Sequence, residues 1–241
     1  MKQGLRSATA FACALVLMGQ SARTSEVPRD PANPTCPQTP NWTDIREMTL
    51  TPLTRNGVRI LLAEGAIDAG LPARLESALS SDQTISEIWL RSSGGNARAG
   101  NAAGLLIRRL GIQTKIPSGW TCFSACNFMF MGGVIRTIEP GGVFMAHMFT
   151  FTSDRGAIRY SVDQGTEATT ELIGDVEQES ALLASEDNDF LIRMGISRRL
   201  LTEVMYRQRA VATDTTPPQR YCLTLEEAQR YNVHSRSRPA E

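Results

Sequence analysis

The chain of 241 residues lacks an excess of charge of either sign. Lys plus Arg and Asp plus Glu number 25 each, and no basic stripe appears beyond short arginine pairs. Nucleic acids and anionic membrane surfaces attract proteins through a field of positive charge, which a balanced chain does not provide. We therefore expect no nucleic acid partner.

Long apolar runs are also missing. A membrane-spanning helix needs about 18 or more consecutive apolar residues. The start of the chain is typical of a secretory signal instead: Lys2 and Arg6 are positive, residues 8–18 are apolar, and Ser21-Ala22 is a small-residue cleavage site. This pattern predicts a signal peptide over 1–22, export to the periplasm or beyond, and no stable membrane insertion after cleavage.

Histidine is scarce, with two in the chain, and no CxxC or HxxxH spacing of zinc sites occurs. We therefore expect no metal and no cofactor. Once the signal is removed, four cysteines remain, an even set suited to disulfides in an oxidising compartment. Four cysteines allow three pairings, and the sequence leaves all three open. The disulfide candidates are Cys36, Cys122, Cys126 and Cys222.

Prolines crowd the start of the predicted mature chain. They are Pro28, Pro31, Pro34, Pro37 and Pro40. Because proline has no N–H to donate and breaks helices, this composition predicts an irregular segment over 23–48 with neither helix nor strand pairing.

Beyond this segment, short apolar runs alternate with helical spacing. The expected strands are 58–63, 85–90, 112–116, 134–138 and 143–148, with helices around 71–79 and 99–110. This alternation predicts an α/β fold with a mostly parallel sheet covered on both faces.

The remainder of the chain is mainly helical. Apolar spacing predicts helix from 167 to 209, then a short strand at 221–223 and a helix opened by a capping-box-like pattern at Thr224. We expect one domain over 49–234, with its helical region at about 150–210, and a polar tail at 235–241.

Several short motifs occur in a fixed order. They are Glu64-Gly65-Ala66-Ile67-Asp68, Arg91-Ser92-Ser93-Gly94-Gly95, Ala99-Gly100, Cys122-Phe123-Ser124-Ala125-Cys126, Met145-Ala146-His147 and Tyr221 to Val233. This order resembles the proteolytic subunit of the Clp protease, in the ClpP/crotonase superfamily, and most of all exported relatives with a Cys-x-Ser-x-Cys turn. The resemblance covers about 64–233 and implies a spiral of β-β-α units with a helical handle.

The resemblance also implies a site. Ser124 would be the nucleophile, His147 its base, and the N–H groups of Gly95 and Ala125 the oxyanion hole. It implies hydrolysis of peptide bonds through an acyl-enzyme, with short peptides or unfolded segments as substrates and a homo-oligomer held by the helices of 167–209. Because an exported protein has no ATP supply, we expect no ATPase partner.

The third member of the expected triad departs from the family. The family's aspartate falls at Gln219 or Arg220. Asp214 lies near enough to replace it through a shifted loop, while Asp187 and Asp189 lie in the helical region. A neutral amide can orient an imidazole but stabilises the imidazolium less than a carboxylate does.

Simpler interpretations stand beside these. Ser124 can be a helix N-cap and His147 a core histidine, the other histidine, His234, being in the polar tail. Cys122 and Cys126 can form a disulfide or supply a thiol nucleophile or redox switch. Competing functions are a non-catalytic binding or scaffold protein with a degraded triad, and an acyl-thioester enzyme, for which an exported location offers no coenzyme A.

Overall fold

The large sheet organises the fold in this computed structural model, which describes residues 28–152, 154–206 and 220–235. Its strands are β3 (Thr49–Arg55), β4 (Val58–Glu64), β5 (Glu87–Arg91), β6 (Gln113–Ile116) and β8 (Arg136–Ile138), in the order β3-β4-β5-β6-β8. β4, β5, β6 and β8 are parallel, and β3 is antiparallel to β4. The predicted α/β class with a mostly parallel sheet is confirmed.

A second, smaller sheet carries the residues of the expected site. It consists of β7 (Thr121–Phe123), β9 (Val143–His147) and β10 (Arg220–Cys222), in the order β10-β9-β7. β7 is parallel to β9, and β10 is antiparallel to it. An isolated bridge between Ser92 and Cys122 connects the end of β5 to β7, so the two sheets meet where the expected site lies.

Three helices pack on the large sheet: α1 (Leu71–Ser81), α2 (Ala97–Arg109) and α3 (Cys126–Gly132). α1 buries Leu71, Leu75 and Leu79, which recur at helical spacing and so share one face. α2 is capped by Asn96, whose side chain accepts a hydrogen bond of 2.8 Å from the Ala99 N–H. α3 is buried along its whole length, as expected for its continuous apolar sequence.

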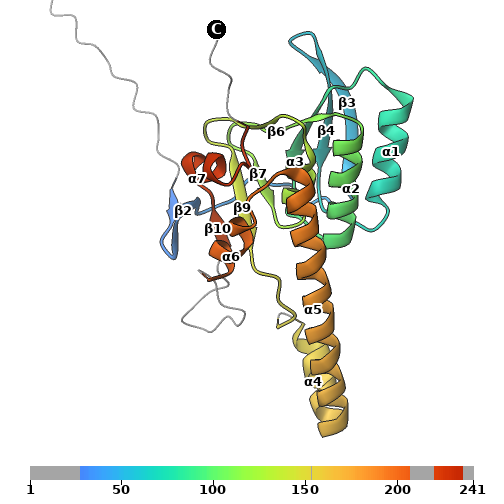
Figure 1. Ribbon diagram of the computed structural model, residues 1–241, viewed down its shortest axis with the longest axis vertical. Helices are drawn as coiled ribbons and strands as arrows, with labels where there is room; N and C mark the ends of the chain where they lie inside the picture. Colours follow the sequence, from blue (N-terminus) through green and yellow to red (C-terminus); the bar gives the residue numbers. More distant parts are fainter. Residues whose placement is uncertain (1–27, 153, 207–219, 236–241) are drawn as a thin grey trace, which may run out of the picture.

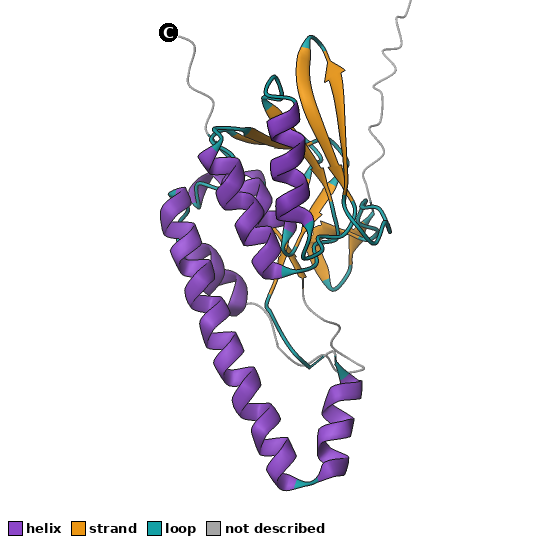
Figure 2. Ribbon diagram, turned by 90° about the vertical axis from the view of Figure 1, so that its right-hand side faces the viewer, coloured by secondary structure: helices purple, strands orange, loops and turns teal. Residues whose placement is uncertain are grey.

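The helices lie on one side of the strands (Figure 2), which differs from the predicted cover on both faces. β5 alternates buried and half-buried residues, so only one of its faces is fully covered. On the other face, the ammonium of Lys115 lies 5.0 Å from the Trp89 ring centroid and the guanidinium of Arg91 lies 5.0 Å from that of Trp120. These long amphipathic side chains shield the sheet without a second helical layer.

A long helical hairpin projects from the body (Figure 1). It is formed by α4 (Arg155–Gln164) and α5 (Thr166–Met194), joined at Gly165, and is followed by α6 (Arg199–Tyr206). α4 lies within the helical region predicted at about 150–210, although ahead of the apolar spacing that begins at 167. The helical region is interrupted, because Gly195 takes a left-handed conformation with φ 67° and ends α5.

The N-terminal prediction was wrong in one respect. β1 (Arg29–Asp30) and β2 (Asn33–Pro37) form a small antiparallel hairpin within the segment expected to be irregular. Proline is compatible with an edge strand, where its missing N–H faces no partner. The hairpin is fixed by a disulfide between Cys36 and Cys222 and by a hydrogen bond from the Cys222 N–H to the Thr35 hydroxyl.

The strand β3 was not predicted, although the sequence carries a signal for it. Asn56-Gly57 lies between β3 and β4, and both residues have positive φ, 49° and 77°. Asn-Gly with this geometry is the favoured two-residue turn of a β-hairpin. The turn therefore adds an antiparallel edge strand to an otherwise parallel sheet.

The chain closes with α7 (Leu225–Arg230), whose predicted capping box is confirmed: Thr224 accepts from the Glu227 N–H, and the Glu227 side chain bonds the Thr224 N–H. His234 does not belong to a free polar tail. Its ring accepts a hydrogen bond of 3.0 Å from the Ile138 N–H of β8. Within the three described stretches, no helix has the length and apolar character that crossing a membrane requires.

Candidate active site

Ser124 occupies a sharp turn between β7 and α3. Its backbone has φ 57°, a left-handed conformation that is unusual for any residue other than glycine. The Ser124 N–H donates to the Met145 carbonyl of β9 at 3.2 Å, which fixes the turn against the neighbouring strand. α3 has no side-chain cap, so the Ser124 hydroxyl does not serve as the N-cap that the simpler interpretation required.

Close backbone contacts hold the turn in place. A Cβ atom at Gly94 would lie 2.6 Å from the Ser124 Cβ, and one at Gly100 would lie 2.5 Å from the Ala125 carbonyl oxygen. Only glycine permits this approach. A disulfide between Cys122 and Cys126 spans the turn. Neither cysteine is therefore a free thiol in this structure.

His147 ends β9 and faces the turn. Its Nε2 lies 2.6 Å from the Ser124 Oγ, within hydrogen-bond distance. The imidazole also packs on Phe123, with 4.8 Å between the ring centroids, and Phe123 in turn stacks on Trp42 at 5.5 Å. The structure thus brings together two residues 23 positions apart in the sequence and supports the imidazole with an aromatic stack.

The surroundings favour a neutral imidazole. Burial lowers the pKa of His147 below its ordinary value of 6.5, and a hydrogen bond to the backbone of Met148 partly opposes this. The ring nevertheless keeps solvent access on one side. A neutral histidine beside a hydroxyl can accept its proton.

Two backbone amides near Ser124 are available to a ligand. Among the described residues, neither the Gly95 N–H nor the Ala125 N–H donates a hydrogen bond. Gly95 has φ 143°, and a Cβ atom there would lie 2.2 Å from the Ile67 carbonyl oxygen, so no other residue fits without a shift of the backbone. Unpaired N–H groups beside a serine hydroxyl are the donors that an oxyanion hole requires.

Arg220, one of the two residues that the resemblance matches to the family's aspartate, lies next to the histidine and is a cation. Arg220 pairs directly with His147 across β10 and β9, and its guanidinium contacts the Asp30 carboxylate at 3.3 Å. No carboxylate in the described part of the chain is bonded to His147. Asp214 and Gln219, the other candidates for the third member, lie outside the described residues.

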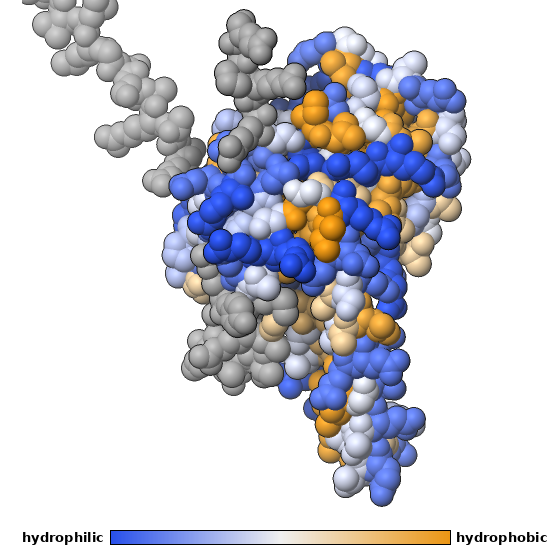
Figure 3. All heavy atoms as spheres, viewed as in Figure 1, coloured by the Kyte–Doolittle hydropathy of each residue, from blue (hydrophilic) through white to orange (hydrophobic). Residues whose placement is uncertain are grey.

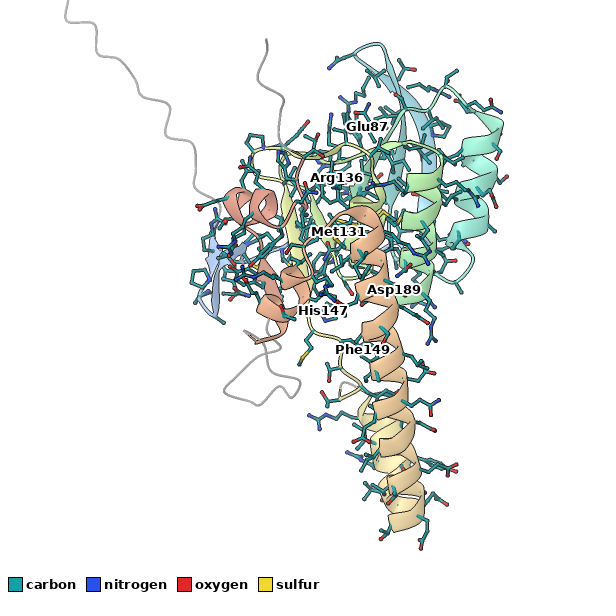
Figure 4. The ribbon with its side chains drawn as sticks, viewed as in Figure 1. Glu87, Met131, Arg136, His147, Phe149 and Asp189 are labelled. Atoms are coloured by element: carbon teal, nitrogen blue, oxygen red, sulfur yellow. A yellow bond between two sulfur atoms is a disulfide. The ribbon has the colours of Figure 1, made fainter. Side chains whose placement is uncertain are left out.

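A cavity of about 610 Å³ opens beside Ser124 and His147. Most of its lining is apolar and comes from α3, β9, the segment after β9, α5 and α6: Phe128, Met131, Phe144, Phe149, Leu183, Leu200 and Leu201. Figure 4 shows His147 and Phe149 on the side of the body toward α5. The helix that projects from the body thus forms a wall of the cavity.

Two polar residues of the cavity were not expected from the sequence. Asn127 is 5% exposed and donates to the Met145 carbonyl at 2.7 Å, while its Oδ1 has no partner in the described structure. Asp187 on α5 also lines the cavity, and burial raises its pKa to about 7, with the charge of Glu186 adding to the shift. The sequence held a signal for Asp187, because it interrupts the apolar face formed by Leu183 and Phe190.

The cysteines adopt one of the three possible pairings, Cys36 with Cys222 and Cys122 with Cys126. Across residues 28–152, 154–206 and 220–235, acidic, histidine and cysteine side chains nowhere gather in the groups of three or more that hold a metal ion. The groups that the described residues bring together beside the cavity include a hydroxyl, an imidazole and two backbone amides.

A scan against protein-family models finds no match, and a search of curated proteins finds none either. Among solved structures, a ClpP1 mutant from Listeria monocytogenes is similar, with 17% identity, a TM-score of 0.48, and coverage of 72% of this chain and 86% of that one. A mutant of the 1510-N membrane-bound stomatin-specific protease has 14% identity, a TM-score of 0.45, and coverage of 70% and 73%. Neither likeness carries an activity to this chain.

Proposed function

We propose that the protein is an exported serine peptidase-like hydrolase that cleaves peptide bonds with Ser124 and His147. The observation that carries the proposal is the distance of 2.6 Å between the Ser124 Oγ and the His147 Nε2 at a left-handed turn. The hydroxyl is not used as a helix cap, so it is free to react. The neighbouring unpaired amides of Gly95 and Ala125 support the same chemistry.

The reaction follows from the roles of these groups. His147 takes the hydroxyl proton as the Ser124 Oγ attacks the scissile carbonyl carbon, and the Gly95 and Ala125 amides bind the oxyanion. His147 then gives the proton to the leaving amine, and the C–N bond breaks to leave an ester on Ser124. Water attacks this ester with His147 again as base, which releases the acid and restores the hydroxyl.

Among the described residues no carboxylate orients His147, and Asp214, the candidate third member, lies outside them. A backbone hydrogen bond at Met148 and the contact with Phe123 hold the ring, and neither supplies a negative charge to an imidazolium. We therefore expect slower turnover than a carboxylate-assisted triad would give. The same feature favours the second candidate, a binding protein that holds peptides in the cavity and leaves them intact.

The setting of the activity is part of the proposal. The predicted signal over 1–22 and the two disulfides are compatible with an oxidising compartment outside the cytoplasm. The α4–α5 hairpin is the expected contact between subunits, since Tyr160, Val162 and Ile173 are 69%, 57% and 53% exposed. Figure 3 shows apolar surface among the hydrophilic surface of this projecting hairpin.

A fluorophosphonate probe tests the proposal, because it reacts with an activated serine. The folded chain without residues 1–22 is expected to be labelled, and Ser124→Ala is expected to abolish labelling. Ser81→Ala, an exposed serine at the end of α1, is the matched control and should label like the parent. Circular dichroism of each variant establishes that it is folded.

The outcome also separates the two candidates. Labelling that persists in Ser124→Ala assigns the reaction to another serine and overturns the proposal. Absence of labelling in the folded parent, together with peptides that bind and are recovered intact, identifies the non-catalytic binding protein instead.

A further inference from the structure

We propose that Asp187 makes the cavity selective for peptides that place a lysine or arginine side chain in it. The inference rests on the proposed function, since it takes the cavity as the place where the residue next to the scissile bond lies. It adds a class of substrate that neither the serine nor the histidine determines.

The position of Asp187 carries the inference. It lies on α5, 63 positions after Ser124, yet both residues line the same cavity of about 610 Å³. Its Oδ1 is buried and has no hydrogen-bond partner in the described part of the chain. A buried carboxylate oxygen without a partner is costly, and a bound cation or N–H donor removes that cost.

The shape and lining of the cavity fit a long basic side chain. The walls around Asp187 are apolar, with Leu183 one turn before it on the same helix and Met131 and Leu201 contributed by α3 and α6. The methylene stem of lysine or arginine packs against such walls while its charged end reaches a carboxylate. A purely aliphatic residue would fill the walls but leave the Asp187 Oδ1 without a partner.

The charged side chains around the cavity also favour a basic ligand. Arg98 is the one arginine or lysine in the cavity lining, and it is held by Glu179 at 2.9 Å and Glu186 at 3.3 Å. Asp187 therefore adds a third carboxylate to a group that contains one guanidinium. A ligand cation restores the balance of charge.

The raised pKa of Asp187 makes the binding of a cation depend on pH. Burial and the charge of Glu186 raise the pKa of Asp187 to about 7, and a hydrogen bond from Asn101 opposes the rise. Arg98, Glu179 and His147 are the other charged or titratable groups in the lining. A bound guanidinium favours the ionised carboxylate, so binding becomes tighter as the pH rises toward 8.

Binding to the inactive Ser124→Ala chain tests the inference without requiring catalysis. Two fluorescent peptides are compared at pH 8 by anisotropy, identical except that one carries arginine and the other citrulline, which has nearly the same shape and no charge. We expect the arginine peptide to bind about 10- to 100-fold more tightly. Asp187→Asn in the same background should remove this ratio.

Asp189→Asn is the matched control. Asp189 lies two residues further along α5 and is exposed (Figure 4 labels it), so its substitution should preserve the ratio. Equal binding of the two peptides, no binding of either, or a ratio that survives Asp187→Asn overturns the inference.

Hydrolysis by the chain with Ser124 intact separates the two proposals. Selective binding to Ser124→Ala with no cleavage by the parent leaves the cation site standing and refutes the hydrolase. Cleavage of arginine and citrulline peptides with equal kcat/KM supports the hydrolase and refutes the role of Asp187.

Discussion

Replacement of Asp187 by asparagine should stabilise the protein, and increasingly so as the pH rises. The pKa of this carboxyl is raised from 3.8 to about 7 in the folded chain, first by burial and then by the charge of Glu186. The folded state therefore favours the protonated form. The stabilisation that protonated Asp187 gives the folded state is fully present below about pH 4 and is lost as the pH rises through about 7.

The magnitude follows from the shift. About three pKa units correspond to about 4 kcal/mol at 1.36 kcal/mol per unit. The carboxyl is only partly buried, so solvent screening reduces this to about 2 kcal/mol. Most of this loss in the free energy of unfolding arises between pH 5 and pH 8, because the carboxyl ionises near pH 4 in the unfolded chain and near pH 7 in the folded chain.

Thermal unfolding at pH 5 and pH 8 measures the effect. At pH 8 we expect Asp187→Asn to raise the Tm by about 4 to 8 °C, using about 2 to 4 °C per kcal/mol for a chain of this size. At pH 5 the increase should be smaller. Asp189→Asn should follow the parent protein at both pH values, since Asp189 is exposed on the same helix.

The comparison isolates Asp187 from its neighbours. Glu179, Glu186, Arg98 and His147 are present in both proteins, so the difference between variant and parent reports the carboxyl of Asp187 together with its interaction with these groups. Parallel Tm curves for Asp187→Asn and the parent from pH 5 to pH 8 would refute the reasoning. Such a result would mean that the carboxylate is as well solvated in the folded chain as in the unfolded one.

Two further predictions concern the turn and its base. Gly100→Ala should destabilise the protein by about 1 to 3 kcal/mol and slow labelling of Ser124, because the added Cβ would lie 2.5 Å from a carbonyl oxygen of the turn. Gly174→Ala, on α5 with open space around it, should instead stabilise the protein by about 0.5 to 1 kcal/mol. Urea unfolding measures the stability of both variants, and equal changes for Gly100→Ala and Gly174→Ala would contradict the prediction. The rate of labelling should rise with pH to a plateau, with a midpoint below 6.5, because burial lowers the pKa of His147. A midpoint above 6.5 in the pH-rate profile would count against the role of His147 as base.

Much of the fold could be predicted because it depends on neighbouring residues. The apolar runs at 58–63 and 85–90 correspond to β4 and β5, and the pattern at Thr224 corresponds to the capped helix α7. Errors arose where composition was taken as decisive. The proline content predicted an irregular N-terminus, but an edge strand can contain proline when a disulfide and side-chain hydrogen bonds hold the strand in place.

For the candidate site, Ser124, His147 and the glycine turn were candidates because several short motifs, in a fixed order, resemble those of a known family. The sequence named Asp187 only as one of the aspartates of the helical region, because the placement of this carboxyl in the cavity depends on how α5 packs beside the turn. It also left the pairing of the cysteines open.

The sequence by itself determined the alternation of strands and helices and the capped last helix, since hydrophobic period and capping act over a few residues. Tertiary structure decided that Ser124 and His147 come within 2.6 Å, which cysteines pair, and that a carboxyl of α5 enters their cavity. Distances between residues far apart in the chain depend on how whole elements pack, and no local pattern contains them.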